Sequence, residues 1–499
     1  MKTMFLTVAA LSIGIPALFT GMQPPRHLSP DYSVTIPADD RSERTSRSYA
    51  DSAPVGTRRS FRSPLPADTG AYYEGSAPHT QQNRAENYAI VFSKTGMEDF
   101  NLRVDCTFTL RFDEDSTAVM RFGGDAAYSV SELRVTVSPE AAWHYDPEAK
   151  TIAFTAPTRQ PRHIRMTYDY CNLTSAFVYG DNGCELWEPS YGENFYPYVF
   201  GDHSLFDVRY ELPAGIVPVG GYPAQECIGK GNTWLFRSCI PEPVVSHSCV
   251  FALLDTTRYR ETVHLLDRDT LRLWFMPAPE VPAARIEELH RLTHDATAFF
   301  AACFGPYDDV RNAISGHPVY LFHTSGYSNR NNLNLISASQ EKFATKPHLL
   351  PLAHEIGHRW LGEWTLLIPD GDEAAYFIKE SLNEYMTLLF VRATAGEDVF
   401  RTLLETEYEK PLQTVRGTTA DAHLIDMRYN NNTAVYCKGP VVLDRVASRM
   451  GYDRWIGFMR RFYATWRYRP GLTYPSFVGL LARDDPQAAR LLDSLVRTF

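Results

Sequence analysis

The feature that most constrains the fold of this chain is a His-Glu-x-x-His pattern spanning His354–His358. Residues four apart share one face of an α-helix, so His354 and His358 can present two imidazoles to one metal ion, with Glu355 beside them. Buried imidazoles and carboxylates need a partner, and a metal ion supplies one. The alternative is a surface helix with two solvated histidines. Against it stand seven apolar neighbours, Leu349, Leu350, Leu352, Ala353, Ile356, Trp360 and Leu361, which predict a buried helix.

A third ligand is expected from the next predicted helix, residues 373–394, which carries Glu380 and Glu384 on one face. We assign Glu380 to the metal and Glu384 to the free ring nitrogen of a ligating histidine, where it would fix the tautomer. The reverse assignment is the alternative. Three protein ligands with one open position are typical of a hydrolytic zinc site, so one Zn²⁺ ion is expected, with Glu355 as the base.

The order of predicted elements indicates an α+β fold. Residues 88–245 contain short alternating strands between turn residues, which predicts an all-β N-terminal domain. Residues 246–499 contain a small sheet followed by helices, which predicts a mostly helical catalytic domain. The aromatic stretch 185–198 either packs the two domains together, which we favour, or lines a cleft.

The N-terminus is typical of an export signal, because Lys2 precedes an uncharged apolar run from Met4 to Phe19. Residues 1–22 are therefore predicted to be a signal peptide, with an uncleaved membrane anchor as the alternative. Residues 23–87 are rich in Pro, Ser, Arg and Asp and are predicted to be a flexible linker. We expect an exported protein, in the periplasm, at the cell surface or outside the cell.

The net charge of −10 argues against a nucleic-acid partner. Eight cysteines are present, and two pairs lie close in sequence, Cys171 with Cys184 and Cys227 with Cys239. In an exported protein these pairs are candidates for local disulfides, with free thiols as the equal alternative.

Beyond these residues, the chain resembles the aminopeptidase-N-like gluzincin zinc metallopeptidases, which include the leukotriene-hydrolase enzymes. The family pattern His-Glu-x-x-His-x-Trp-x-Gly is matched by residues 354–362. Its glutamate-bearing stretch is loosely matched by Lys379–Tyr385, which places the ligand at Glu380. Three residues more than the family pattern separate His358 from Glu380. The resemblance covers roughly residues 90–499 and implies a β-rich domain ahead of a thermolysin-like catalytic domain, without the helical C-terminal domain of many members.

The resemblance also implies a catalytic tyrosine. In the family this tyrosine precedes x-Lys-Gly, and Tyr436 is followed by Cys-Lys-Gly here. Tyr436 is therefore expected to donate a hydrogen bond to the oxyanion that forms on the substrate.

One departure concerns the stretch in which the family's Gly-x-Met-Glu-Asn glutamate binds the substrate's α-ammonium. Here the stretch begins at Gly326, Asn329 stands in the glutamate's place, and Arg330 follows it. A neutral amide cannot give the charge-assisted bond that a carboxylate gives an ammonium. Glu188, in the aromatic stretch, is the candidate replacement anion.

Together these features predict zinc-dependent hydrolysis of a peptide or protein substrate by an exported peptidase. Aminopeptidase specificity is the leading interpretation. An endopeptidase or other specificity, suggested by Asn329, and a non-catalytic zinc-bearing interaction protein are the alternatives.

Overall fold

The computed structural model describes most of the chain beyond residue 82. The described residues are 33–34, 83–96, 101–112, 117–123, 128–172, 179–180, 183–184, 186–187, 194–220, 226–245, 247, 249–266, 269–277, 280–305, 307, 318–323, 330–332, 335–345, 349–362, 364–368, 371–418, 421–427 and 433–499.

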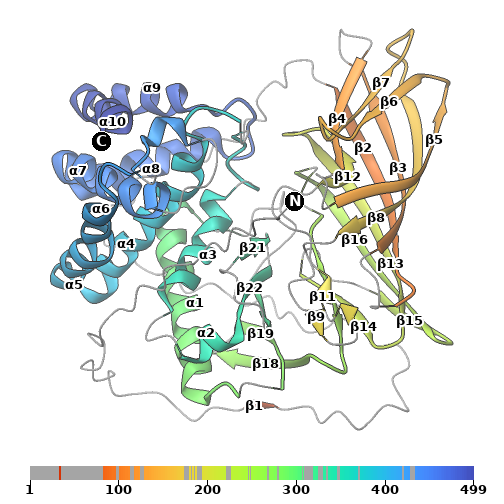
Figure 1. Cartoon of the computed structure of the whole chain (residues 1–499), viewed down its shortest axis with the longest axis horizontal. Helices are drawn as coiled ribbons and strands as arrows, with labels where there is room; N and C mark the ends of the chain where they lie inside the picture. Colours follow the sequence, from red (N-terminus) through yellow and green to blue (C-terminus); the bar gives the residue numbers. More distant parts are fainter. Residues whose placement is uncertain are drawn as a thin grey trace, which may run out of the picture.

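The N-terminal part is a β-rich region built on two sheets (Figure 1). Strands of the larger sheet alternate buried and exposed positions, as in β3, so one of its faces forms a core. Aromatic pairs join the two sheets, because Phe108 meets Phe154 and Phe122 meets Tyr168 edge to face. The larger sheet has the order β15 (Glu226–Lys230), β16 (Thr233–Val245), β13 (His203–Pro213), β2 (Arg84–Ser93), β3 (Asn101–Arg111), β8 (Arg162–Asn172) and β5 (Tyr128–Ser138). The smaller sheet has the order β12 (Asn194–Tyr198), β4 (Thr117–Gly123), β7 (Thr151–Thr155) and β6 (Ala142–Asp146).

Short strands connect this region to the next. Three of them form a small sheet in the order β11 (Leu186–Trp187), β17 (Ala252–Asp255) and β14 (Ile216–Val219), and β9 (Tyr179–Gly180) pairs with β10 (Gly183–Cys184).

A six-stranded mixed sheet opens the second region. Its order is β1 (Ser33–Val34), β18 (Arg260–Leu266), β19 (Asp269–Phe275), β20 (Val319–His323), β22 (Leu335–Ser339) and β21 (Arg330–Asn332). Strand β21 is therefore an edge of this sheet.

Helices predominate in the rest of the described residues and are coloured green to blue in Figure 1. They are α1 (Ala283–Phe304), α2 (Gln340–Thr345), α3 (Leu350–Leu361), α4 (Leu382–Ala395), α5 (Glu397–Leu403), α6 (Lys410–Val415), α7 (Gly439–Met450), α8 (Tyr452–Trp466), α9 (Tyr474–Asp484) and α10 (Pro486–Thr498). Short π-helical turns η2 (Phe377–Ser381), η3 (Leu404–Glu409) and η5 (Ala434–Lys438) and the 3₁₀ turn η4 (Leu424–Asp426) interrupt them. The predicted α+β class, β-rich then mostly helical, is confirmed.

A tryptophan and a glycine fix helix α3 between α1 and α4. The Trp360 ring stacks on Phe300 of α1, and its indole Nε1 donates to the carbonyl of Gly305. On the same helix, a Cβ on Gly357 would lie 2.1 Å from Oδ1 of Asn383 in α4. Glycine at this position therefore allows α3 and α4 to approach closely, which brings the His pair near Glu380 and Glu384.

Part of the aromatic stretch 185–198 lies at the junction of the two regions. Phe195 and Tyr196 are buried, and the hydroxyl of Tyr196 accepts a hydrogen bond from the backbone N–H of Cys249. Tyr198 and Trp364 both contact the ring of His247. The described part of the stretch therefore packs, as the favoured interpretation expects.

Two stretches inside the predicted linker 23–87 are strands. Ser33–Val34 pairs with the edge of β18, and β2 begins at Arg84, before the predicted domain start at residue 88. Backbone pairing with β18 and β3 explains both, since neither stretch has apolar periodicity. The rest of 1–82 lies outside the described residues, and so does the signal peptide. Among the described helices, none is long and apolar enough to cross a membrane.

Cys227 and Cys239 are not joined by a disulfide in the structure. Cys227 lies opposite Phe236 in the β15–β16 ladder, three residues from Cys239 along β16. Side chains alternate between faces along a strand, so an odd separation puts Cys239 on the other face. In the other pair, Cys171 is likewise not in a disulfide.

We expect Gly357→Ala to lower the free energy of unfolding by about 1–3 kcal/mol through overpacking. The added methyl would meet Asn383 and the ring of Phe300, at 2.6 Å from its Cζ, and both side chains are fully buried. Gly479→Ala in α9 is the matched control, because no atom lies within 4 Å of its Cβ position. The control should gain about 0.5–1 kcal/mol from helix propensity. Equal effects of both variants in thermal unfolding would contradict the close α3–α4 contact.

Candidate active site

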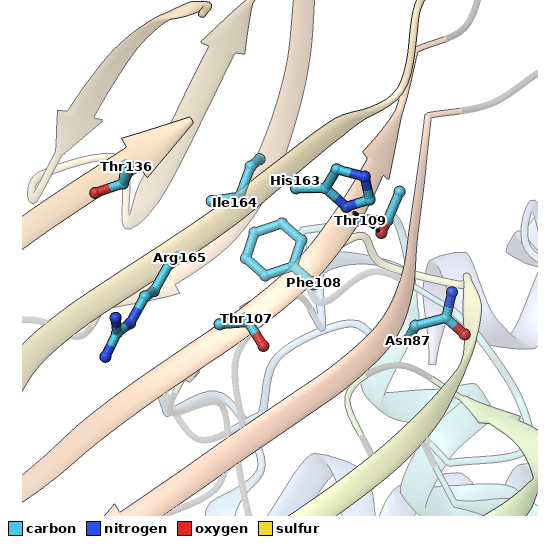
Figure 2. A pocket seen from close by; sticks show the side chains of 8 residues that line it. All are labelled: Asn87, Thr107, Phe108, Thr109, Thr136, His163, Ile164 and Arg165. Atoms are coloured by element: carbon cyan, nitrogen blue, oxygen red, sulfur yellow. Dashed lines mark hydrogen bonds between the residues drawn. The ribbon is translucent and has the colours of Figure 1, made fainter. Parts of the chain in front are cut away.

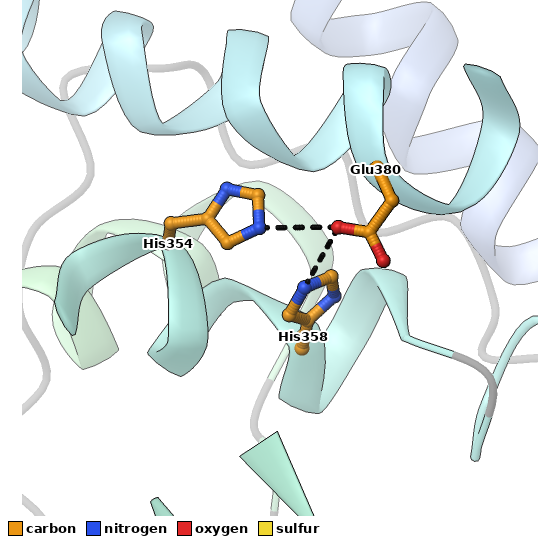
Figure 3. Close-up of side chains that lie close together, drawn as sticks. All are labelled: His354, His358 and Glu380. Atoms are coloured by element: carbon orange, nitrogen blue, oxygen red, sulfur yellow. Dashed lines mark hydrogen bonds and ion pairs between the residues drawn. The ribbon is translucent and has the colours of Figure 1, made fainter. Parts of the chain in front are cut away.

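Three ligand-type side chains converge between α3 and η2. The Nε2 atoms of His354 and His358 lie 3.3 and 3.2 Å from the same oxygen, Oε2 of Glu380 (Figure 3). Their ligand atoms all lie within 4.8 Å of one another. The two imidazoles come from consecutive turns of α3 and meet at nearly right angles, so both point toward the carboxylate.

The ends of α3 set the position of this pair. Pro351 lies in the first turn, where its missing N–H costs nothing. At the other end, a Cβ on Gly362 would lie 2.3 Å from the carbonyl oxygen of His358, so a glycine is needed where the helix stops. Thr365 then donates to the carbonyl oxygen of Trp360, 2.5 Å away. This explains in physical terms why Trp-x-Gly follows the His pair.

Glu384 occupies a different position from Glu380. Its Oε2 lies 2.6 Å from Nδ1 of His354, on the side of the ring away from Glu380. Its Oε1 accepts a hydrogen bond of 2.5 Å from the hydroxyl of Tyr408. The geometry therefore separates the two glutamates: Glu380 faces both Nε2 atoms, and Glu384 faces the remaining nitrogen of His354.

Burial and charge act against each other in this cluster. Burial would raise the pKa of Glu380, but His358 and His354 outweigh it and hold that pKa well below its ordinary value. Burial would lower the pKa of His354, but Glu384 and Glu380 outweigh it and raise that pKa well above its ordinary value. Without a metal ion, the protein thus favours the charged forms of Glu380 and His354. A divalent cation can take the place of the proton on His354.

Glu355 and Tyr436 border the same cluster. Glu355 is buried, and this burial raises its pKa, with His358 and His354 opposing the shift. The hydroxyl of Tyr436 donates to Oε2 of Glu380 at 3.1 Å, and its ring lies 5.7 Å from that of His354. The predicted base and oxyanion donor therefore both lie beside the three ligand-type groups.

The lysine that follows Tyr436 ties its turn to other segments. Lys438 is buried, and its Nζ donates to Oδ1 of Asp421 at 2.6 Å and to the carbonyl oxygen of Ala422 at 3.0 Å. The ring of Phe499 lies 5.6 Å from the same Nζ. The Lys-Gly pair after the tyrosine thus has a structural reason: Lys438 anchors the turn η5, and Gly439 lets it approach Ser381, whose Oγ would lie 2.1 Å from a Cβ.

The predicted substrate-binding residues are not placed. Gly326, Asn329 and Glu188 lie outside the described residues, and Arg330 begins the edge strand β21 with its side chain undescribed. Strand β21 packs against α3, so the segment itself borders the site.

A separate hollow of about 270 Å³ lies on the seven-stranded sheet (Figure 2). It is lined by Asn87, Thr107, Phe108, Thr109, Thr136, His163, Ile164 and Arg165, none of them a predicted site residue.

Comparison by sequence finds no matching family model and no matching curated protein. Comparison of structures does find similar proteins. An M1 zinc metallopeptidase from Deinococcus radiodurans matches with a TM-score of 0.62 and 16% identity over 84% of this chain and 95% of that chain. The same values hold for a glutamate-to-alanine mutant from this bacterium bound to a Tyr-Ser-Ala substrate.

A two-domain M1 zinc metallopeptidase mutant bound to L-tryptophan is similar as well, with a TM-score of 0.63 and 16% identity over 84% of this chain and 96% of that chain. At this level of identity the likeness shows the fold. The neighbours are zinc metallopeptidases of the family that the motifs resemble.

Sequence reasoning missed Tyr408 and Asn383. Asn383 donates from Nδ2 to the carbonyl oxygen of His354 at 2.7 Å, and Tyr408 reaches Glu384 from a different helical segment. The position of Asn383 beside Glu384 was a usable signal for α3–α4 contact. Tyr408 had none, because its neighbours in sequence are ordinary surface-type residues.

We expect Asp421→Asn to lower the free energy of unfolding by about 1–2 kcal/mol at pH 7, because it leaves buried Lys438 without its carboxylate. The hydrogen bond from Lys438 holds the pKa of Asp421 below its ordinary value. The stabilisation is therefore complete above about pH 4 and is lost as pH falls through the lowered pKa. Denaturation from pH 7 to 3 should show the difference from wild type shrinking below about pH 4. A difference that is constant with pH would contradict this account, and Glu287→Gln on the exposed face of α1 is the control.

Proposed function

We propose that this chain is a zinc-dependent peptidase whose metal is held by His354, His358 and Glu380. The observation that carries the proposal is the meeting of two imidazole Nε2 atoms at one carboxylate oxygen, bordered by Glu355 and Tyr436. The structural likeness to M1 zinc metallopeptidases supports it.

The donor set fits zinc. Two imidazoles and one carboxylate form a known catalytic zinc set, which leaves a fourth position open. Ligand atoms about 2.1 Å from a tetrahedral ion lie about 3.4 Å apart. The separations of 3.3 and 3.2 Å from each Nε2 to Oε2 of Glu380 agree with that spacing. When bound, zinc acts as a Lewis acid that polarises a carbonyl and lowers the pKa of water.

The side chains around the ligands divide the remaining chemistry. The carboxylate of Glu355 takes a proton from the attacking water and returns it to the leaving amine. Its raised pKa suits both steps, since a base must hold the proton between them. The phenol of Tyr436 donates a hydrogen bond to the oxygen that gains negative charge. Glu384 keeps the Nδ1 proton of His354 in place and so presents Nε2 for binding.

For specificity we propose an aminopeptidase. The neighbouring structures are bound to a tripeptide substrate and to L-tryptophan, which are ligands with a free α-amino group. The edge strand β21 offers backbone groups with which an extended peptide can pair. Asn329 in place of the family's glutamate favours the alternative, an endopeptidase. Glu188, which directly follows β11, is the proposed replacement anion. The predicted signal at residues 1–22 supports a location outside the cytoplasm.

Glu355→Gln should reduce kcat on a peptide panel by about 10²–10⁴-fold, because the amide cannot accept the water's proton. Zinc content should stay at one ion per chain, since Glu355 is not among the three converging ligands. Glu287→Gln, on an exposed position of α1, is the charge-matched control and should keep full activity. Undiminished hydrolysis by the Glu355 variant would exclude the proposed mechanism. A zinc-loaded wild type that cleaves no peptide in a broad library would instead support the non-catalytic alternative.

Free and N-acetylated forms of one peptide should separate the two specificities. An aminopeptidase cleaves the free form and rejects the blocked one, because acetylation removes the ammonium charge that an acidic group binds. Equal cleavage of both forms would favour the endopeptidase. If the free form is preferred and Glu188 is the anion that binds its ammonium, Glu188→Gln should raise KM for the free peptide. The same variant should change KM little for a substrate cleaved at an internal bond.

A further inference from the structure

Three π-helical turns lie in the described part of the helical region, and two of them carry proposed site residues. Turn η2 carries Glu380 and turn η5 carries Tyr436. A π turn inserts one extra residue into a helix; such turns are rare and are frequently found at functional sites. The third turn, η3, carries no residue that the proposed function uses, although it packs against η5.

The three turns are joined by hydrogen bonds. The hydroxyl of Ser381 in η2 donates to the carbonyl oxygen of Val435 in η5 at 2.6 Å. The thiol of Cys437 in η5 lies 3.9 Å from the carbonyl oxygen of Glu407 in η3, at the length of a weak hydrogen bond. The third turn is therefore part of the framework that holds the other two.

Turn η3 also directs one side chain at the ligand cluster. Tyr408 is buried, and its hydroxyl donates to Oε1 of Glu384. The other oxygen of that carboxylate faces Nδ1 of His354. A series of close polar contacts thus connects the Tyr408 phenol to the Glu384 carboxylate and that carboxylate to the His354 imidazole. The Nε2 atom of this imidazole lies 3.3 Å from Oε2 of Glu380.

We propose that Tyr408 is a positioning residue for the metal centre, acting through Glu384 on His354. This inference rests on the proposed zinc function. The phenol occupies one carboxylate oxygen of Glu384 and so restricts rotation of the carboxylate, which keeps its second oxygen on Nδ1. Nδ1 then keeps its proton, and the lone pair of His354 stays on Nε2.

The chemistry of the residue suits this role. A phenol is a donor that stays protonated at neutral pH, and burial together with Glu384 raises the pKa of Tyr408 well above its ordinary value. Phenylalanine would fill the same space but leave Oε1 of Glu384 without this buried donor. The carboxylate would then rotate more freely, and the orientation of His354 would be less defined.

Tyr385 provides a matched control on the same helix as Glu384. Its buried hydroxyl also donates to a carboxylate, Oδ1 of Asp444 at 3.2 Å. Asp444 is not one of the residues whose ligand atoms converge. Tyr408→Phe and Tyr385→Phe therefore remove the same chemical group from similar surroundings, but only one of them should affect the metal.

The test measures zinc affinity by competition with a chelator, together with thermal unfolding of the zinc-free chain. Tyr408→Phe should weaken zinc binding about tenfold, at the low end for groups that support a ligand. Tyr385→Phe should leave zinc affinity within about twofold of wild type, although both variants lose stability from a buried hydrogen bond. Equal affinities in the two variants would overturn the proposal.

Glu384→Gln completes the experiment as the background for a double mutant. If Tyr408 acts through Glu384, then adding Tyr408→Phe to Glu384→Gln should cause little further loss of affinity, so the two effects are not additive. Additive losses would overturn the route through Glu384. If Tyr408→Phe folds poorly, Glu384→Gln alone still tests this route, because it should weaken zinc binding about tenfold or more, and an unchanged affinity would overturn the proposal. A wild type without tight zinc binding would instead refute the proposed function, so the two failures are distinguishable.

Discussion

The structure of the helical region depends on bringing three charged or polar ligand side chains together in its interior. Of these three, His354 and Glu380 are each less than a tenth exposed, and burying them costs free energy unless they are paired. Here each ligand has a partner within hydrogen-bonding range, and a second carboxylate, Glu384, adds further charge. Such a cluster is a poor source of stability compared with an apolar core. Its presence in the interior therefore indicates a binding role, and the surrounding packing must offset its cost.

Two glycines show how the packing provides for this cluster. Gly357 lets α4 approach α3, and Gly439 lets η5 approach η2, with predicted Cβ contacts of 2.1 Å in both cases. Because glycine has no side chain, each of the two contacts is close: α3 with α4 at Gly357, and η5 with η2 at Gly439. The segments that carry the His pair and Tyr436 thus also carry the glycines that allow close packing around the cluster.

Much of the site follows from local pattern, because its main motif lies within one helix. The His pair, Glu355 and the class of fold could be predicted, since helical spacing and apolar periodicity are short-range signals. Helical spacing alone left the order of Glu380 and Glu384 open, because both lie on one helix face, and the assignment of Glu380 to the metal drew on the family resemblance. The three-dimensional position of the His rings distinguishes the two glutamates. Tyr408 was beyond prediction for a stronger reason. Its contact with Glu384 joins residues 24 apart in sequence, through a π turn that no residue pattern in the chain indicates.

The residues proposed for hydrolysis and the residues proposed for substrate binding lie on different kinds of element. The proposed ligands, the proposed base and the phenols lie on helices that are packed against one another on several sides, so their relative positions are constrained. The segment around Asn329, by contrast, leads into an edge strand with one neighbour in the sheet. An edge strand can change its side chains at less cost to packing than a buried helix can. A difference in substrate preference at Asn329, with the proposed hydrolytic groups unchanged, is therefore one that this architecture permits.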